Sequence, residues 1–210
     1  MHGFWKSSTH THSLNAWLAL LQVCFREHPS HTANGLAGVM ATWAPKLHQY
    51  YAETLGQLYA RDTTLTCVFP NSIFSATSYN LGPRTACFKH TDFANLPFGL
   101  CSITALGSYD PSKGGHLVLW ECKLVIEFPP ASTILIASGI VAHSNVPVGG
   151  DETRYSVAHY SAGALFRWVE NDFLRSVDFL ASLSEEEVLA VQMRDLSRWK
   201  MGLSLLPVFN

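Results

Sequence analysis

The chain has 210 residues, of which 48% are hydrophobic and 14% charged, and its formal net charge is −2. This composition is typical of a single globular domain with a buried core, and it excludes disorder as the main state of the chain. The slightly negative charge also excludes an overall electrostatic attraction for nucleic acid, which needs a basic excess or stripe, and leaves a local basic groove as the alternative.

The five cysteines are neither even in number nor spaced as C-x-x-C. We interpret them as buried thiols of an intracellular protein in a reducing compartment, the nucleus or the cytoplasm. No window of the sequence approaches the roughly 20 apolar residues of a membrane-spanning helix, so we expect no membrane partner.

Two helices are predicted before the strand-rich part of the chain. Residues 14–27 repeat apolar side chains at i, i+3, i+4 and i+7, which predicts a helix with one buried face. Residues 45–60 begin with a proline and place Leu47, Tyr51 and Leu55 on a shared stripe, which predicts the second helix.

From residue 64 to 168, short runs rich in β-branched and aromatic residues alternate with Gly, Pro, Asn and Asp. The predicted strands are residues 66–70, 84–89, 100–106, 116–121, 123–128, 133–138 and 154–161. No helical pattern separates them, which favours an antiparallel sandwich or barrel.

The chain becomes helical again after residue 168, where Ser184 and Glu187 form a capping-box pattern. We therefore treat residues 1–210 as one domain in three parts. These are a helical part (1–62), a β part (63–168) and a C-terminal helical part (169–210).

Three residues of the β part have the side chains of a metal site. His90 and Asp92 stand two apart, so on an extended backbone their side chains share one side. His143 follows later in the same region, and we expect it on a strand that packs beside the segment of the first pair. Two imidazoles and one carboxylate are the set that binds Fe(II) on one face and leaves positions open for other ligands.

Arg154 and Ser156 follow His143 and share one strand face. A guanidinium is the natural bidentate partner of a carboxylate, and the serine hydroxyl can add a hydrogen bond. With ten histidines, a lone H-x-D is close to an even chance, and His143 or Arg154 alone has an ordinary alternative as a core histidine or a surface cation. The interpretation therefore depends on the order H-x-D, His, R-x-S within the strand-rich region.

Four stretches carry a family resemblance: "HTDFANLPFG", "GGHLVLWE", "FPPASTILIASGIVAHSNVPV" and "RYSVAHYSAGALFRW". They resemble the 2-oxoglutarate and Fe(II)-dependent dioxygenases, in detail the fungal branch grouped with the TET and JBP nucleic-acid oxygenases. The resemblance spans roughly residues 79–168. It implies an α+β fold, in which a double-stranded β-helix core (jelly-roll or cupin-like) is flanked by N- and C-terminal helices.

The resemblance also implies roles for single residues. His90, Asp92 and His143 are the expected iron ligands, and Arg154 is expected to bind the C5 carboxylate of 2-oxoglutarate, with O2 as the second co-substrate. Asn95 matches the asparagine of the H-x-D-x-H-N pattern that approaches the target base in TET and JBP enzymes. The histidine before that asparagine is replaced here by Ala94.

Other candidates lie near these residues in sequence. Tyr79 and Asn80 precede the ligand segment and are candidates for the C1 carboxylate of 2-oxoglutarate, the alternative being a plain strand end. Phe93 is a candidate for stacking on a base. His116 follows a glycine pair and is a candidate for the pocket wall, the alternative being a half-buried strand histidine.

Three functions are consistent with these residues. The first is an Fe(II) and 2-oxoglutarate dioxygenase that hydroxylates a C–H bond, with a methylated base of DNA or RNA as substrate. The second keeps this chemistry for a small molecule or a protein side chain, which the absence of a basic stripe favours. The third is a non-catalytic β-helix module that binds a metal or ligand. The oligomeric state is left open.

Overall fold

The structure, a computed structural model, describes residues 38–66, 69 and 72–206. The predicted helix at 14–27, and most of the strand predicted at 66–70, lie outside the described residues. None of the helices in the described ranges has the length and apolar character needed to cross a membrane.

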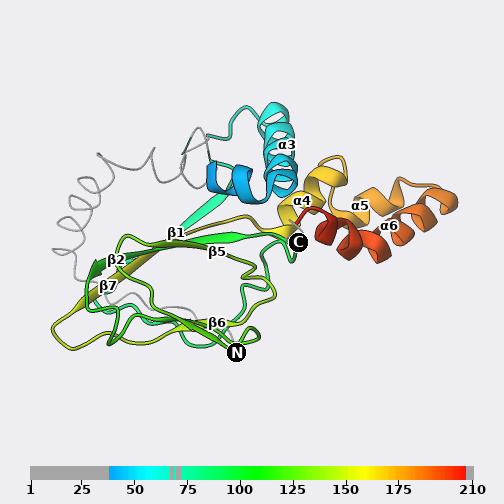
Figure 1. Ribbon diagram of the computed structural model, residues 1–210. Coiled ribbons are helices and arrows are strands. Elements are labelled where there is room, and N and C mark those ends of the chain that lie inside the picture. Colours follow the sequence, from blue (N-terminus) through cyan, green and yellow to red (C-terminus); the bar gives the residue numbers. More distant parts are fainter. Residues whose placement is uncertain (1–37, 67–68, 70–71, 207–210) are drawn as a thin grey trace.

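The helices lie together on one side of the β-rich part (Figure 1). The labelled helices are α3 (Pro45–Arg61), α4 (Gly163–Glu170), α5 (Ser176–Ala181) and α6 (Glu185–Ser204), and residues 38–43 are also helical. The strands are β1 (Ala76–Asn80), β2 (Cys101–Ser108), β3 (Leu117–Leu119), β4 (Leu124–Ile126), β5 (Thr133–Ile136), β6 (His143–Asn145) and β7 (Thr153–Tyr160).

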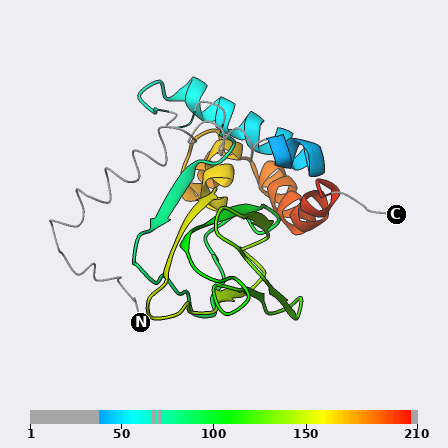
Figure 2. The same ribbon diagram turned by 60° about the vertical axis from the view of Figure 1, so that its left-hand side comes forward.

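The strands form two antiparallel sheets that face each other (Figures 1 and 2). One sheet has the order β1-β7-β2-β5 and the other β4-β3-β6. An isolated antiparallel bridge between His90 and His143 adds a fourth segment beside β6. Apart from the hairpin of β3 and β4, which stays within one sheet, the chain alternates between the sheets from β1 to β7. This is the course of a double-stranded β-helix, and the predicted fold class is confirmed.

Strand β7 lies between β1 and β2 and determines which side chains face the space between the sheets. Its register places Arg154 opposite Gly107 of β2 and Ser156 opposite Asn80 of β1. Arg154, Ser156, Ala158 and Tyr160 line the inner cavity, whereas His159 does not. The alternation predicted for this strand is therefore confirmed.

Helix α3 covers the outer face of the four-stranded sheet (Figure 1). It begins with a proline in its first turn and buries Leu47, Tyr51 and Leu55, so the helix predicted at 45–60 is confirmed to within one residue. Its buried side chains join a core made by the helices and by the segments that contain residues 73–74 and 96–98: Met40, Ala44, Leu47, Tyr51, Ile73, Phe74, Leu96, Phe98 and Phe166.

A second core cluster involves strands of both sheets. It consists of Ala105, Leu117, Leu119, Phe128 and Ile136, contributed mainly by β2, β3 and β5. This cluster ties the two sheets together, so the ligand-bearing segments rest on a packed interior.

Several boundaries differ from the predictions. Residues 84–89 form no strand, and only Arg84 makes an isolated bridge, to Arg154. Strand β1 was not among the predicted strands, whereas His143 was expected on a strand and begins the three-residue β6. Helix α4 begins at Gly163, so the helical part starts before residue 169. The capping box of α6 is confirmed, because Ser184 Oγ accepts from Glu187 N and Ser184 N donates to Glu187 Oε2.

Candidate metal centre and cavity

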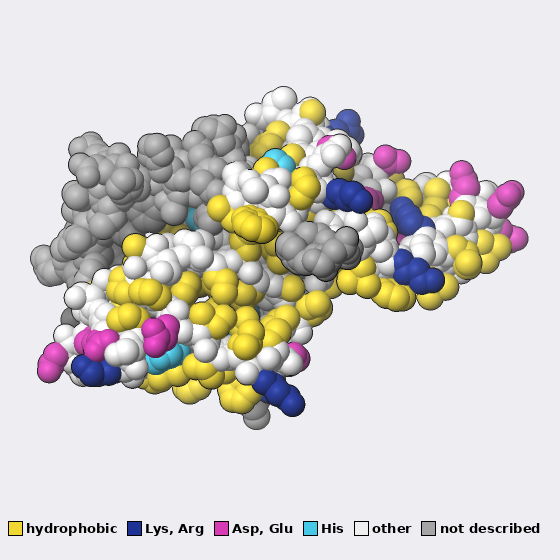
Figure 3. Space-filling view, in the orientation of Figure 1, with side chains coloured by type: hydrophobic (Ala, Val, Ile, Leu, Met, Phe, Trp, Pro, Cys, Tyr) yellow, Lys and Arg dark blue, Asp and Glu magenta, His cyan; other side chains and the backbone are white. Residues whose placement is uncertain are grey.

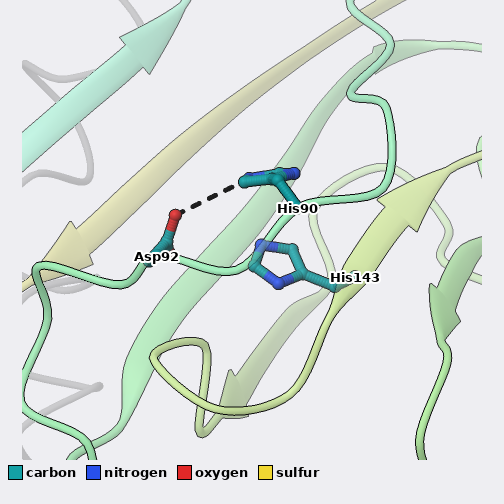
Figure 4. A group of neighbouring side chains, drawn as sticks. All are labelled: His90, Asp92 and His143. Atoms are coloured by element: carbon teal, nitrogen blue, oxygen red, sulfur yellow. Dashed lines mark ion pairs between the residues drawn. The ribbon is translucent and has the colours of Figure 1, made fainter.

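His90, Asp92 and His143 point toward one another at the edge of the three-stranded sheet (Figure 4). One potential ligand atom from each residue lies within 4.8 Å of the others. Among the residues that the structure describes, this is the one group of three or more His, Cys, Asp or Glu side chains so arranged. The structure therefore brings together the three residues predicted as metal ligands.

Backbone hydrogen bonds fix the positions of these ligands. His90 and His143 exchange two bonds, from His90 N to His143 O at 3.1 Å and from His143 N to His90 O at 2.9 Å. Asp92 N donates to Ser138 O at 2.8 Å. The two histidines thus face each other as a directly paired couple, with ring centroids 4.4 Å apart.

Each histidine ring also has its Nδ1 next to a backbone carbonyl. His90 Nδ1 lies 2.7 Å from Phe88 O, and His143 Nδ1 lies 3.0 Å from Val141 O. A carbonyl can only accept, so each neutral ring carries its proton on Nδ1. The Nε2 lone pairs are then free for a metal, in the arrangement that is usual for metal-bound histidines.

The electrostatics favour the neutral form of His143. Burial lowers the pKa of His143, and the neighbouring His90 lowers it further. His90 Nε2 lies 3.6 Å from Asp92 Oδ1. Two ligand atoms that are each about 2.1 Å from one metal, at a right angle to each other, lie about 3 Å apart. His90 Nε2 and Asp92 Oδ1 therefore need to move only slightly closer to bind the same metal.

Asn95 contacts the metal-ligand carboxylate. Its Nδ2 donates to Asp92 Oδ2 at 3.3 Å and to Ser138 Oγ at 3.1 Å, and its backbone N donates to Asp92 O at 2.8 Å. Asn95 also lines the cavity. Its amide therefore orients Asp92, a role that the sequence pattern did not indicate.

A cavity of about 710 Å³ lies between the sheets and reaches the three ligands. Its walls come from β1, β2, β3, β6 and β7 and from the segment that carries His90 and Asp92. This volume falls within the range of small-molecule sites.

Arg154 lies deep in this cavity and is only 2% exposed. Its Nη1 donates to Thr85 O at 3.2 Å, while Nε has no hydrogen-bond partner. A buried donor without a partner costs free energy, roughly 1–3 kcal/mol, and such groups are rare unless a ligand or water satisfies them. A carboxylate entering the cavity would satisfy this guanidinium.

The backbone around Arg154 is closely packed. Gly107 lies opposite Arg154 and has φ of +117°, and a Cβ there would meet Thr153 O at 2.3 Å. Burial raises the pKa of the Tyr109 phenol, and the nearby Arg154 guanidinium opposes this rise. The position of Arg154 is therefore set by its neighbours.

Asn80 and Ser156 also face the cavity. Asn80 Nδ2 donates to Ser156 Oγ at 2.9 Å, so an amide and a hydroxyl lie on the same wall as Arg154. Tyr79 and His116 are not among the lining residues. Tyr79 is the neighbour of Asn80 in β1 and points to the opposite face, so this placement gives no support to its predicted contact with the co-substrate.

Aromatic side chains border the cavity on its solvent side. Phe93 is 89% exposed and Phe88 is similarly exposed, and both line the cavity. Lys89 also lines it, and its Nζ lies 4.5 Å from the ring centroid of Trp120. Phe93 was predicted to lie at the site. Phe88 was missed, although its place two residues before His90 was a signal.

No protein-family model and no curated protein matches the sequence. Two similar solved structures are "NgTET1 in complex with 5mC DNA" and the viral collagen prolyl hydroxylase vCPH of Paramecium Bursaria Chlorella virus-1 in its 2OG complex. The first has a TM-score of 0.42 and 16% identity, and the match covers 71% of this chain and 47% of that one. The second has a TM-score of 0.30 and 11% identity, covering 51% and 68%.

The chain thus spans about half the length, 47%, of the first of these structures. The function proposed below depends on the site itself.

Proposed function

We propose that the protein is an Fe(II)- and 2-oxoglutarate-dependent dioxygenase that hydroxylates a C–H bond of its substrate. The observation that carries this proposal is the position of Arg154. A buried guanidinium with an unpartnered Nε lines the same cavity as two histidines and one aspartate whose ligand atoms lie within 4.8 Å. This combination is suited to a metal together with a carboxylate ligand.

His90, Asp92 and His143 would hold the iron. When bound, the iron and 2-oxoglutarate supply the oxidising chemistry that uses O2 to hydroxylate an unactivated C–H bond. The residues fit Fe(II) because two neutral imidazoles and one carboxylate occupy one face of an octahedral ion. The carbonyls of Phe88 and Val141 keep both Nε2 atoms unprotonated for this purpose.

The remaining polar residues would hold the co-substrate. Arg154 binds the C5 carboxylate of 2-oxoglutarate through charge-assisted hydrogen bonds, and the Ser156 hydroxyl adds a further contact. Asn80 lies next to Ser156 and extends this polar wall. The two sheets enclose Arg154, and the exclusion of water strengthens its attraction for an anion.

For the substrate we propose a methylated base of DNA or RNA. Phe88 and Phe93 offer exposed aromatic faces at the cavity rim, next to the metal ligands, where an unstacked base could lie. The net charge of −2 favours the alternative, a small molecule or a protein side chain. Both substrates would use the same metal and co-substrate residues.

The first experiment is an anaerobic titration of the metal-free protein with Fe(II) and 2-oxoglutarate, followed by visible absorption. We expect the metal-to-ligand charge-transfer band of the ternary complex. The band should vanish in His143→Ala and persist in the matched control His116→Ala, whose histidine lies outside the cavity. A folded protein that binds metal without this band would overturn the proposal and leave a metal-binding module.

The substrate is tested by succinate release. Methylated oligonucleotides are compared with the same sequences without the methyl group, at two salt concentrations. Stimulation by the methylated strand only, with binding that weakens as salt rises, supports a base as substrate. Equal, salt-independent rates for both strands contradict it and favour the small-molecule or protein alternative.

A further inference from the structure

Helix α6 has an exposed apolar stripe on the side that faces away from the domain. The stripe consists of Leu189, Met193, Leu196 and Leu203. With Lys200, which lies between the last two, successive positions are four, three, four and three residues apart. Met193 is 66% exposed and Leu196 is 72% exposed. This spacing is the heptad pattern of a helix that packs against another helix.

The opposite side of α6 is attached to the domain. Gly202 is buried, and a Cβ there would meet the Phe98 ring at 2.3 Å. Arg198 Nη1 lies 2.6 Å from Glu170 Oε2, and Tyr50 Oη donates to Glu170 Oε1 at 2.6 Å. These contacts join α6 to α4 and α3, so the stripe is held in a fixed, outward orientation.

Figure 1 shows α5 and α6 extending away from the two sheets, and Figure 3 shows hydrophobic side chains exposed along this arm. The short helix α5 adds the exposed Val177 and Leu180. Monomeric proteins rarely expose a contiguous apolar surface of this kind, which more often marks an interaction site.

The charges of α6 indicate which partner covers the stripe. The helix begins with Glu185, Glu186 and Glu187, whereas its second half carries Arg194, Arg198 and Lys200 against a single Asp195. A helix that is acidic at one end and basic at the other is complementary to a second copy of itself running in the opposite direction. Parallel pairing would instead place like charges together.

We propose that α6 pairs with α6 of a second copy of this chain in an antiparallel, two-fold symmetric dimer. The stripe of one helix packs on the stripe of the other. The Glu186 end of each helix lies beside the Lys200 end of its partner. Such an interface is self-complementary and closes after two copies, so no filament forms.

The test is sedimentation equilibrium of the full chain. We expect a mass about twice the 23.2 kDa of one chain. The double variant Met193→Glu with Leu196→Glu should be a folded monomer, because both side chains are exposed and support no core contact. The matched control Val125→Glu, at an exposed apolar position of β4, should leave the dimer intact.

A charge swap tests the antiparallel arrangement. Glu186→Lys alone and Lys200→Glu alone should each weaken the dimer roughly tenfold, and the combined variant should restore it, because each contact then has its charges exchanged. A wild-type monomer, as expected if another segment or another protein covers the stripe, overturns the proposal. A dimer that persists in the Met193→Glu and Leu196→Glu double variant also overturns it. The same holds if the single charge reversals weaken the dimer and the combined variant does not restore it.

Discussion

Asn95 holds the carboxylate of Asp92 from the side opposite the histidines. Its amide donates to Asp92 Oδ2 at 3.3 Å, while Asp92 Oδ1 lies 3.6 Å from His90 Nε2. The same amide donates to Ser138 Oγ at 3.1 Å. One carboxylate oxygen of Asp92 is thus hydrogen-bonded to Asn95, and the other points toward the metal position.

This anchoring predicts the effect of Asn95→Ala on metal affinity. Removal of a partner that orients a metal ligand typically weakens binding about 10- to 100-fold, and we expect a loss of this size for Fe(II). Anaerobic titration with Fe(II) measures it, with Asn80→Ala as the control that should leave Fe(II) affinity unchanged. An Asn95→Ala protein with native affinity would show that Asp92 needs no such support.

Arg154 provides a separate prediction for the co-substrate. Arg154→Lys keeps the charge but loses the planar fork, so we expect 2-oxoglutarate to bind about 10- to 100-fold more weakly, with Fe(II) affinity unchanged. The dissociation constant of 2-oxoglutarate is measured by the charge-transfer band at saturating Fe(II). Arg84→Lys is the matched control, because Arg84 is exposed. Equal losses in both variants would falsify the assignment.

His159 predicts how stability depends on pH. It lies on the outer face of β7, where its Nδ1 is 2.9 Å from Thr77 Oγ1, and burial lowers its pKa below the ordinary 6.5. As the pH falls through 6.5, the unfolded chain therefore takes up a proton before the folded chain does. The free energy of unfolding should fall as the pH drops below this value and should not change above it on account of this group.

Urea unfolding of the metal-free protein between about pH 7.5 and about pH 5 measures this dependence. His143 acts in the same direction, because burial also lowers its pKa. We expect His159→Gln to flatten the curve in part. A variant whose stability declines as steeply as that of the native chain would contradict the assignment to His159.

Cys101 predicts a difference in thiol reactivity. It is buried against the cavity, where burial and the Asp92 carboxylate raise its pKa to about 12. Near pH ~8 its thiolate fraction is then about a thousandfold below that of an ordinary thiol. Iodoacetamide labelling resolved by peptide mass spectrometry should modify the exposed Cys122 long before Cys101. Similar labelling rates would show that the cavity wall opens readily.

The sequence was sufficient to predict which residues meet at the centre of the site. His90, Asp92 and His143 have side-chain types that suit few other purposes together, and Arg154 and Ser156 share a face through the period of two of a strand. The composition of β7, with valine and two tyrosines, made that strand visible.

The sequence alone could not show which of Tyr79 and Asn80 faces the cavity. Strand β1 reads "ATSYN", which lacks the β-branched run of a typical strand, and it forms by pairing with β7. Once that register is known, Asn80 lies opposite Ser156 and Tyr79 opposite Val157, so alternation directs them to different faces. A strand at His143 was expected, but its bounds could not be given, since the three residues "HSN" of β6 form a strand only between two partners.

The contact of Asn95 with Ser138 was also beyond sequence reasoning. The two residues lie 43 positions apart and meet because the loop after β5 passes next to the ligand segment. A hydrogen bond of this kind depends on tertiary packing, and neither residue type marks it in advance.

The pairing of His90 with His143 connects the metal centre to the folding of the chain. The two backbones bond to each other across more than fifty intervening residues, so the ligands meet only after the β region has closed on itself. An unfolded chain has no comparable site, and a bound metal therefore adds stability by mass action. In a refolding experiment, uptake of the metal would report the moment at which the segment of His90 and strand β6 come together.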